Sequence, residues 1–220
     1  MSVLTTHVGS LPRTQEIVDF IFAREKEQPY EQSAFDAAMT AAVSETVARQ
    51  KAAGVDIVSD GETSKISYAT YVKDRYTGFA GDSPRNAPAD LKLFPSFLQR
   101  LSDDGGTPTY ARPMCVGAVK SKGQDELNKD IANLKAAMAD HDVERGFMNA
   151  ASPGVISLFL QNDFYPTRED YLQAPMVKGG FGVWANTPAG WSLLKPFERC
   201  AQSEACFRPP GASGFKVYNK

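Results

Sequence analysis

The segment from residue 33 to residue 59 constrains the fold most, because two kinds of secondary structure follow each other there with one glycine between them. From Ser33, which we expect to be the N-terminal cap, apolar residues recur at helical spacing as far as Ala53. Gly54 then has the place of a C-terminal cap, and the run 55–59 has the composition of a buried strand. A helix that leads directly into a buried strand is typical of parallel α/β proteins.

The remainder of the first 174 residues continues this alternation. A β-prone run at 3–8 precedes a helix that Thr14 would cap and that extends to about residue 25. This order favours either a TIM-type (β/α)8 barrel or an open doubly wound sheet, and about four strands by residue 151 make half of such a barrel. The other expected elements are a helix at 68–76, a short helix near 94–101 in a loop-rich insertion, strands at 110–119 and 146–151, helices at 127–140 and 155–160, and a helix that begins at Arg168 and that Pro175 ends.

Composition and charge exclude several classes of protein. The net charge of −2 and the pI near 5.8 give no basic surface for nucleic acid. No window is apolar enough for a membrane helix, and the N-terminus lacks the features of a signal peptide. The three cysteines, Cys115, Cys200 and Cys206, are too few for a disulfide scaffold and lack the spacing of a zinc site. We therefore expect a globular, cytoplasmic protein.

Two of the expected strands end in small, polar or acidic residues. The first ends at Gly9 and Ser10, and the second ends in an acidic turn that contains Glu62. In a parallel barrel, functional groups lie at the carboxyl ends of the strands. Gly9 allows close approach of a ligand, Ser10 could hold a carboxylate, and Glu62 offers a carboxylate to an ammonium group. Together they suit the two ends of an amino acid, although two ordinary turns would have the same composition.

Other candidate residues carry less information. A histidine such as His7, beside a strand end, is more often simply hydrogen-bonded than catalytic, and His141 lies in a polar helix end where we expect solvent. Residues 149–154 place polar and small residues after a strand, consistent with a loop on the same face as the candidate pocket. The glycine cluster at 179–182 lacks the strand–helix context of a phosphate loop.

Several segments resemble the C-terminal catalytic domain family of cobalamin-independent methionine synthase. They are TTHVGSLPR, QKAAGVDIVSDGETSK, and GFMNAASPGVISLF followed by YPTREDYL. The resemblance is strongest to the short, single-domain methionine-synthase-like proteins, and it covers residues 1–174. It implies a TIM-type barrel of the superfamily shared with uroporphyrinogen decarboxylase, and transfer of a methyl group from methyltetrahydrofolate to the homocysteine thiol, which gives methionine.

The resemblance also implies roles for individual residues. In the family, the segment that matches Val8, Gly9 and Ser10 and the glutamate that matches Glu62 contact the amino-acid part of homocysteine. Relatives that act on other thiols, such as coenzyme M, share the barrel, and a thiol with a sulfonate would have less use for Glu62. The complete family binds zinc through a His-x-Cys pair and a distant Cys, but no histidine follows His141. Zinc is thus expected for the family, while its ligands are not found in this chain.

The composition changes after residue 174. Residues 175–220 contain 6 Gly and 5 Pro in 46 positions and carry a charge of +4, whereas the first 174 residues carry −6. We expect residues 1–174 to be the N-terminal part of the barrel domain and residues 175–220 to be a divergent basic tail, either disordered or frame-shifted, or else lineage-specific. The chain is then a methyltransferase-family protein or, alternatively, a truncated inactive fragment. Such a thiol-binding half barrel would associate with itself through open sheet edges.

Overall fold

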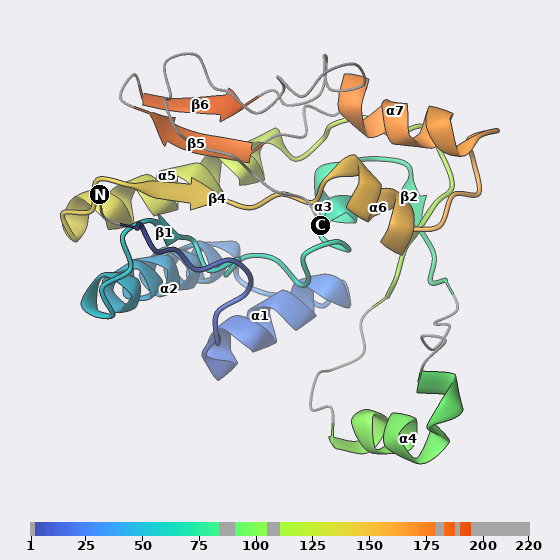
Figure 1. Ribbon diagram of the computed structural model, residues 1–220, viewed down its shortest axis with the longest axis horizontal. Helices are drawn as coiled ribbons and strands as arrows, with labels where there is room; N and C mark the ends of the chain where they lie inside the picture. Colours follow the sequence, from blue (N-terminus) through green and yellow to red (C-terminus); the bar gives the residue numbers. More distant parts are fainter. Residues whose placement is uncertain (1–2, 84–90, 105–110, 179–182, 188–189, 195–220) are drawn as a thin grey trace.

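The structure is a computed structural model of the chain, and it describes residues 3–83, 91–104, 111–178, 183–187 and 190–194. Helices and strands alternate around one main sheet, and α2 and α5 pack against each other beside it (Figure 1). The chain is therefore an α/β protein, but the strands of its described part do not close into a barrel. The glycines at 179–182 and the cysteines Cys200 and Cys206 lie outside the described residues.

The main sheet has the strand order β1-β4-β5-β6. β1 (Val58–Ser59) and β4 (Gly146–Met148) are parallel, as the sequence predicts, with Val58 opposite Gly146. On the other side of β1, Thr6 forms a parallel bridge with Ile57, which places the N-terminal segment beside it. The carboxyl ends of these three segments therefore lie at the same edge of the sheet.

Two further strand pairs differ from the expected alternation. β5 (Val183–Thr187) and β6 (Gly190–Leu194) continue the sheet antiparallel to β4, in a region for which the sequence predicts no strands. β2 (Phe79–Ala80) and β3 (Met114–Cys115) form a separate antiparallel pair. β3 falls within the strand expected at 110–119.

The first two helices show how local sequence fixes their ends. α1 (Gln15–Glu25) begins after Thr14, whose hydroxyl accepts the backbone N–H of Ile17, so the predicted cap is confirmed. The predicted cap of α2 (Gln32–Ala52) at Ser33 is wrong, because the carboxylate of Glu31 accepts the N–H of Ser33 at 2.8 Å and the helix already begins at Gln32. Gly54, with φ of 77°, ends α2 as predicted.

The last helix extends farther than the sequence predicts. Pro175 lies inside α7 and does not end it. A proline removes the hydrogen bond to the carbonyl four residues earlier, here that of Tyr171, and it kinks a helix without always ending it. The first turns of α7 are held by Tyr171 itself, which is 1% exposed and donates its hydroxyl to the carbonyl of Leu160 at 2.9 Å. The remaining helices are α3 (Val72–Arg75), α4 (Pro95–Asp104) after the 3-10 turn η1 (Leu91–Leu93), α5 (Gln124–Asp140), α6 (Pro153–Phe159) and α7 (Arg168–Lys178).

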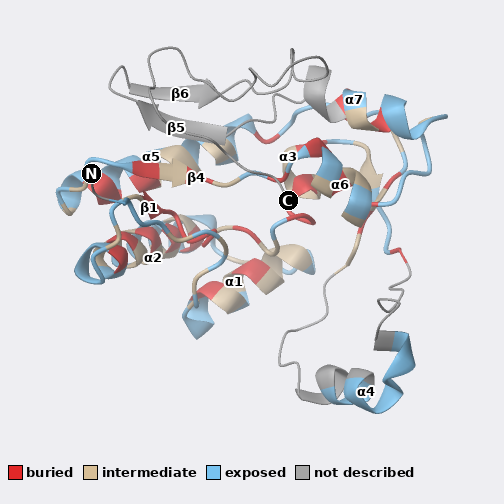
Figure 2. Ribbon diagram, in the orientation of Figure 1, coloured by how far each residue is buried: buried red, intermediate tan, exposed pale blue. Residues whose placement is uncertain are grey.

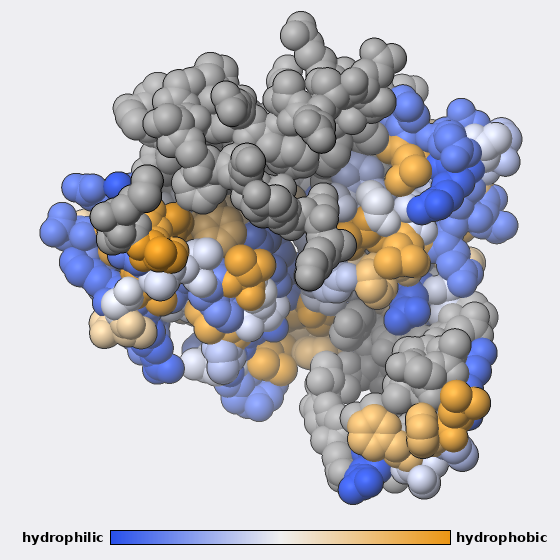
Figure 3. Space-filling view, viewed as in Figure 1, coloured by the Kyte–Doolittle hydropathy of each residue, from blue (hydrophilic) through white to orange (hydrophobic). Residues whose placement is uncertain are grey.

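The hydrophobic core holds in place the edge of the sheet at which the N-terminal segment, β1 and β4 end. Val47 of α2, Val58 of β1 and Leu134 of α5 are fully buried in one cluster, while Phe35 and Met39, near the start of α2, pack on α1 in another. Buried residues accordingly line α2, β1 and α5 where these elements face one another (Figure 2). By contrast, α4 lies apart from the sheet and exposes apolar side chains (Figures 1 and 3). No helix in the described ranges is both long enough and apolar enough to cross a membrane.

Candidate functional site

Three polar side chains from different strand ends meet at the carboxyl edge of the sheet. The hydroxyl of Ser10 donates to Oε2 of Glu62 at 2.8 Å. The side-chain amide of Asn149, which directly follows β4, donates to Oε1 of the same carboxylate at 3.1 Å. The sequence predicts Ser10 and Glu62 as site residues, and the structure brings them together. Asn149 was expected only as part of a loop on this face, and its position after a strand was the signal for it.

Glu62 has an unusual backbone conformation. Its φ is 54°, in the left-handed region that favours glycine, and the preceding Gly61 has φ of 62°. A side chain at Gly61 would also collide with α2, because its Cβ would lie 2.9 Å from a methyl group of Thr46. Strained backbone of this kind persists only where surrounding contacts hold it, and it is concentrated at functional sites. The turn therefore presents Glu62 in a fixed orientation.

The carboxylate of Glu62 is buried without a direct cationic partner. Its residue is 5% exposed, both oxygens accept from neutral donors, and none of the ion pairs in the described part of the chain includes it. Lys65 lies close by, but its amine donates to the backbone carbonyl of Asn149 at 2.6 Å. A buried carboxylate in this state is suited to receive a cationic group from a ligand.

Lys65 also keeps its charge and helps to hold the loop after β4. Burial lowers the pKa of Lys65, but the neighbouring Asp60 and Tyr71 and other acidic groups raise it by more, so the net shift is upward. The amine lies 5.3 Å from the ring centre of Tyr71, whose hydroxyl accepts the N–H of Ala151 at 3.2 Å. Lys65 and Tyr71 together fix the backbone from which Asn149 reaches Glu62.

The N-terminal segment that bridges to Ile57 is open toward solvent at its end. Val8 is 67% exposed, and Gly9 has φ of 106° with no atom within 4 Å of the position that a Cβ would occupy. A ligand can therefore approach the backbone here. Nε2 of His7 lies 3.1 Å from the carbonyl oxygen of Gly9, which confirms that His7 is hydrogen-bonded within its own loop.

Residues 3–85 match the family model described as the catalytic domain of cobalamin-independent synthase. The predicted resemblance to the cobalamin-independent methionine synthase family is thus confirmed for this N-terminal part of the chain. Among solved structures, the chain is similar to a B12-independent methionine synthase from Shewanella sp. W3-18-1, in complex with selenomethionine, at 19% identity and a TM-score of 0.50. The match covers 78% of this chain and 44% of that chain, and at this identity it shows the fold alone. No curated protein matches the chain.

The family's zinc ligands have no counterpart in the described structure. Within the described ranges, no three His, Cys, Asp or Glu side chains gather as a metal site. Cys115 is fully buried, which raises the pKa of its thiol, and it packs as the sequence predicts for a lone cysteine. His141, which we expected to be solvated, is partly buried, and its Nε2 lies 3.0 Å from the hydroxyl of Ser44.

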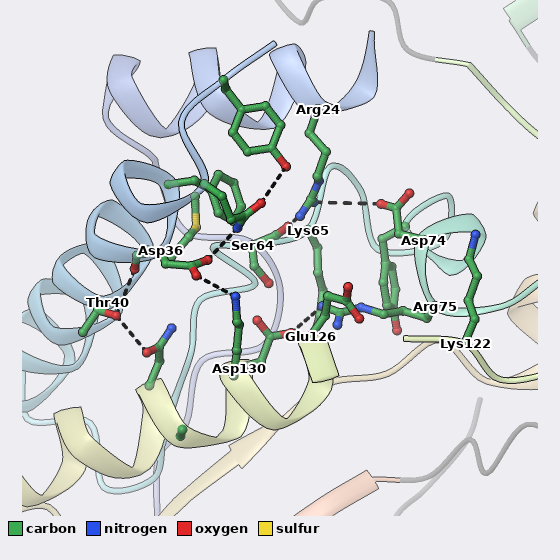
Figure 4. Close-up of a pocket in the computed structure, with 18 residues that line it drawn as sticks. Arg24, Asp36, Thr40, Ser64, Lys65, Asp74, Arg75, Lys122, Glu126 and Asp130 are labelled. Carbon is green, nitrogen blue, oxygen red and sulfur yellow. Dashed lines mark hydrogen bonds and ion pairs between the residues drawn. The ribbon is translucent and has the colours of Figure 1, made fainter. Parts of the chain in front are cut away.

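A cavity of about 460 Å³ lies between α1, α2 and α5 (Figure 4). Lys65 lines it too, so the cavity adjoins the strand-end site through this side chain. Its charged groups are largely paired with one another, which favours a structural role over the binding of a charged substrate. These ion pairs are Arg75 with Asp130 at 2.6 Å, Lys129 with Asp36 at 2.6 Å, and Arg24 with Asp74 at 3.9 Å.

Proposed function

We propose that this chain supplies the N-terminal part of a TIM-type (β/α)8 barrel and binds the amino-acid end of a thiol substrate at the carboxyl edge of its sheet. The observation that carries the proposal is the buried carboxylate of Glu62, held by Ser10 and Asn149 and lacking a direct cationic partner within the described residues. The α-ammonium group of an amino acid supplies that direct partner. The open backbone at Gly9, next to Val8, then faces its carboxylate, while the hydroxyl of Ser10 stays bonded to Glu62.

The proposed reaction is transfer of a methyl group from methyltetrahydrofolate to the sulfur of homocysteine, which gives methionine. The family match over residues 3–85 supports it, as does a similar solved structure in complex with selenomethionine, which has the same amino-acid end as methionine. Coenzyme M has a sulfonate and no ammonium group, so it would leave Glu62 without a counter-charge. The geometry therefore favours homocysteine over that thiol.

The described residues do not fit a zinc ion, so no step of this proposal passes through one. In the family, zinc would supply activation of the thiol as a thiolate. This chain's own residues bind and orient the amino-acid end of the substrate. We place the activity in the cytosol, because the free, buried thiol of Cys115 suits a reducing compartment.

Methionine binding tests the proposal. We expect the protein to bind methionine about 10-fold to 100-fold more tightly than 4-(methylthio)butanoate, which lacks only the ammonium group, because a hydrogen bond to a charged group contributes about 1.5–3 kcal/mol. Isothermal titration calorimetry with both ligands measures the difference. Equal affinities would show that Glu62 does not receive an ammonium group.

We further propose that the chain associates with itself through its N-terminal segment. Val3 is 90% exposed and Leu4 is 40% exposed, at the start of the segment that Thr5 and Thr6 join to the edge of the sheet. Exposed apolar edges of this kind promote pairing between chains. Light scattering after size exclusion should give a mass above the 24.0 kDa of one chain, and Val3→Lys should return it to that value. A monomer at all concentrations would contradict self-association.

A further inference from the structure

We propose that Arg13 is a positioning residue that holds Glu62 in the orientation needed for the ligand. This inference rests on the function proposed above and deepens it. Arg13 lies three residues after Ser10, in the loop that follows the N-terminal segment. The sequence alone did not indicate it as a site residue. Its guanidinium reaches across to the turn that contains Glu62.

The guanidinium of Arg13 binds three backbone carbonyls of that turn. Nη2 donates to the carbonyl of Glu62 at 2.8 Å and to that of Lys65 at 2.7 Å, and Nε donates to that of Thr63 at 3.1 Å. Beside it, the N–H of Leu11 donates to the carbonyl of Gly61 at 3.0 Å. Together with the bond from Ser10 to the Glu62 side chain, these contacts join the loops after two neighbouring strands.

These contacts explain how the left-handed conformation of Glu62 is held. Buried carbonyls need hydrogen-bond donors, and those of Glu62, Thr63 and Lys65 in this turn all accept from Arg13. The planar fork of an arginine can satisfy several carbonyls at once, whereas a lysine offers a single point of charge. Burial lowers the pKa of Arg13, and Glu62 and Asp60 oppose that effect, so the guanidinium stays charged beside the carboxylate.

Arg24 provides a matched control. Its Nη2 donates to the carbonyl of Ser64 at 2.8 Å and lies 3.9 Å from Asp74, so it binds the same turn two residues beyond Glu62. Loss of Arg24 should therefore affect the stability of this region without changing the orientation of Glu62. Loss of Arg13 should affect both.

A double-mutant cycle tests the positioning role. Arg13→Met should weaken methionine binding at least about 10-fold, Arg13→Lys should restore little of it, and Arg24→Met should change it less than about 2-fold. In a Glu62→Gln background, Arg13→Met should cause no further loss, because its effect passes through the carboxylate. An equal loss in both backgrounds would show that Arg13 acts independently of Glu62 and would overturn the inference.

A second measurement needs no ligand. The ¹³C resonance of the Glu62 carboxyl group should shift in Arg13→Met and stay unchanged in Arg24→Met, in proteins whose unfolding midpoints are measured in parallel. If the wild-type protein does not bind methionine, the proposed function fails, and this resonance still decides the positioning role. An unshifted resonance in folded Arg13→Met protein would overturn it.

Discussion

Replacing Glu62 by glutamine should weaken methionine binding about 30-fold to 4,000-fold. The removal of one partner from a buried, hydrogen-bonded charge pair costs about 2–5 kcal/mol, and each 1.4 kcal/mol is about a factor of ten in affinity. Glutamine keeps the shape of the side chain and can still accept the hydroxyl proton of Ser10. What it lacks is the negative charge that faces the ligand's ammonium group. Titration calorimetry of both proteins with methionine measures the change.

The control for this prediction is Glu45→Gln. Glu45 lies on the exposed side of α2, 60% of its side chain is accessible, and it pairs with Arg49 in the next turn. Its replacement removes the same charge but leaves the hydrogen bonds from Ser10 and Asn149 to Glu62 in place, so methionine affinity should stay within about 2-fold. If Glu62→Gln binds methionine as tightly as Glu45→Gln does, Glu62 is not part of the site.

The helices could be predicted from the sequence because their signals are local. Thr14 caps a helix three residues from the N–H that it accepts, and Gly54 ends one by its own backbone conformation. The cap at Ser33 was wrong for a related reason: a glutamate two residues earlier can reach the same N–H groups, and residue preference alone ranks serine above it. The start of α2 was therefore missed by two residues, and the end of α7 by more, because Pro175 does not end that helix.

The candidate site could be predicted only in part. That Ser10 and Glu62 would lie together followed from the rule that parallel strands end at one edge of the sheet. The contacts of Arg13 did not follow, because they join carbonyl groups about 50 residues away in the sequence, and no periodicity marks them. The role of Asn149 depends on the register between β1 and β4, which the sequence does not specify for such short strands.

The hairpin of β5 and β6 was not predicted, because the local composition indicates loops whereas the strands depend on pairing with a distant segment. Many glycines and prolines in residues 175–220 indicate loops. In the structure, the short runs at 183–187 and 190–194 pair with each other and with β4, and this antiparallel register extends the sheet. Strand formation at this edge therefore depends on a partner strand that lies some 35 residues earlier, which local composition cannot reveal.

Replacing Asp130 by alanine should lower the free energy of unfolding by about 3–5 kcal/mol, because it leaves the guanidinium of Arg75 buried without its counter-charge. The two side chains are 13% and 12% exposed, and Nη2 of Arg75 donates to Asp130 at 2.6 Å. The same change at Glu45, whose pair with Arg49 is exposed, should cost about 0.3–0.5 kcal/mol. Urea unfolding of both variants gives these values. Equal losses of unfolding free energy at Asp130 and Glu45 would contradict a buried ion pair. The double variant Arg75→Met with Asp130→Leu should recover most of the stability that Asp130→Ala loses.

The same pair predicts how stability depends on pH. Burial raises the pKa of Asp130, and the attraction of Arg75 only partly opposes this. As the pH rises above the ordinary aspartate value of about 3.9, the unfolded chain releases this proton first, while the folded protein still holds it. The contribution of Asp130 to stability therefore falls with rising pH until the raised folded pKa is passed, and it is constant above that. Asp130→Asn does not titrate, so the difference in unfolding free energy between wild type and this variant should decrease or change sign across that interval. A difference that does not vary with pH would show that the pKa of Asp130 is the same in the folded and unfolded chains.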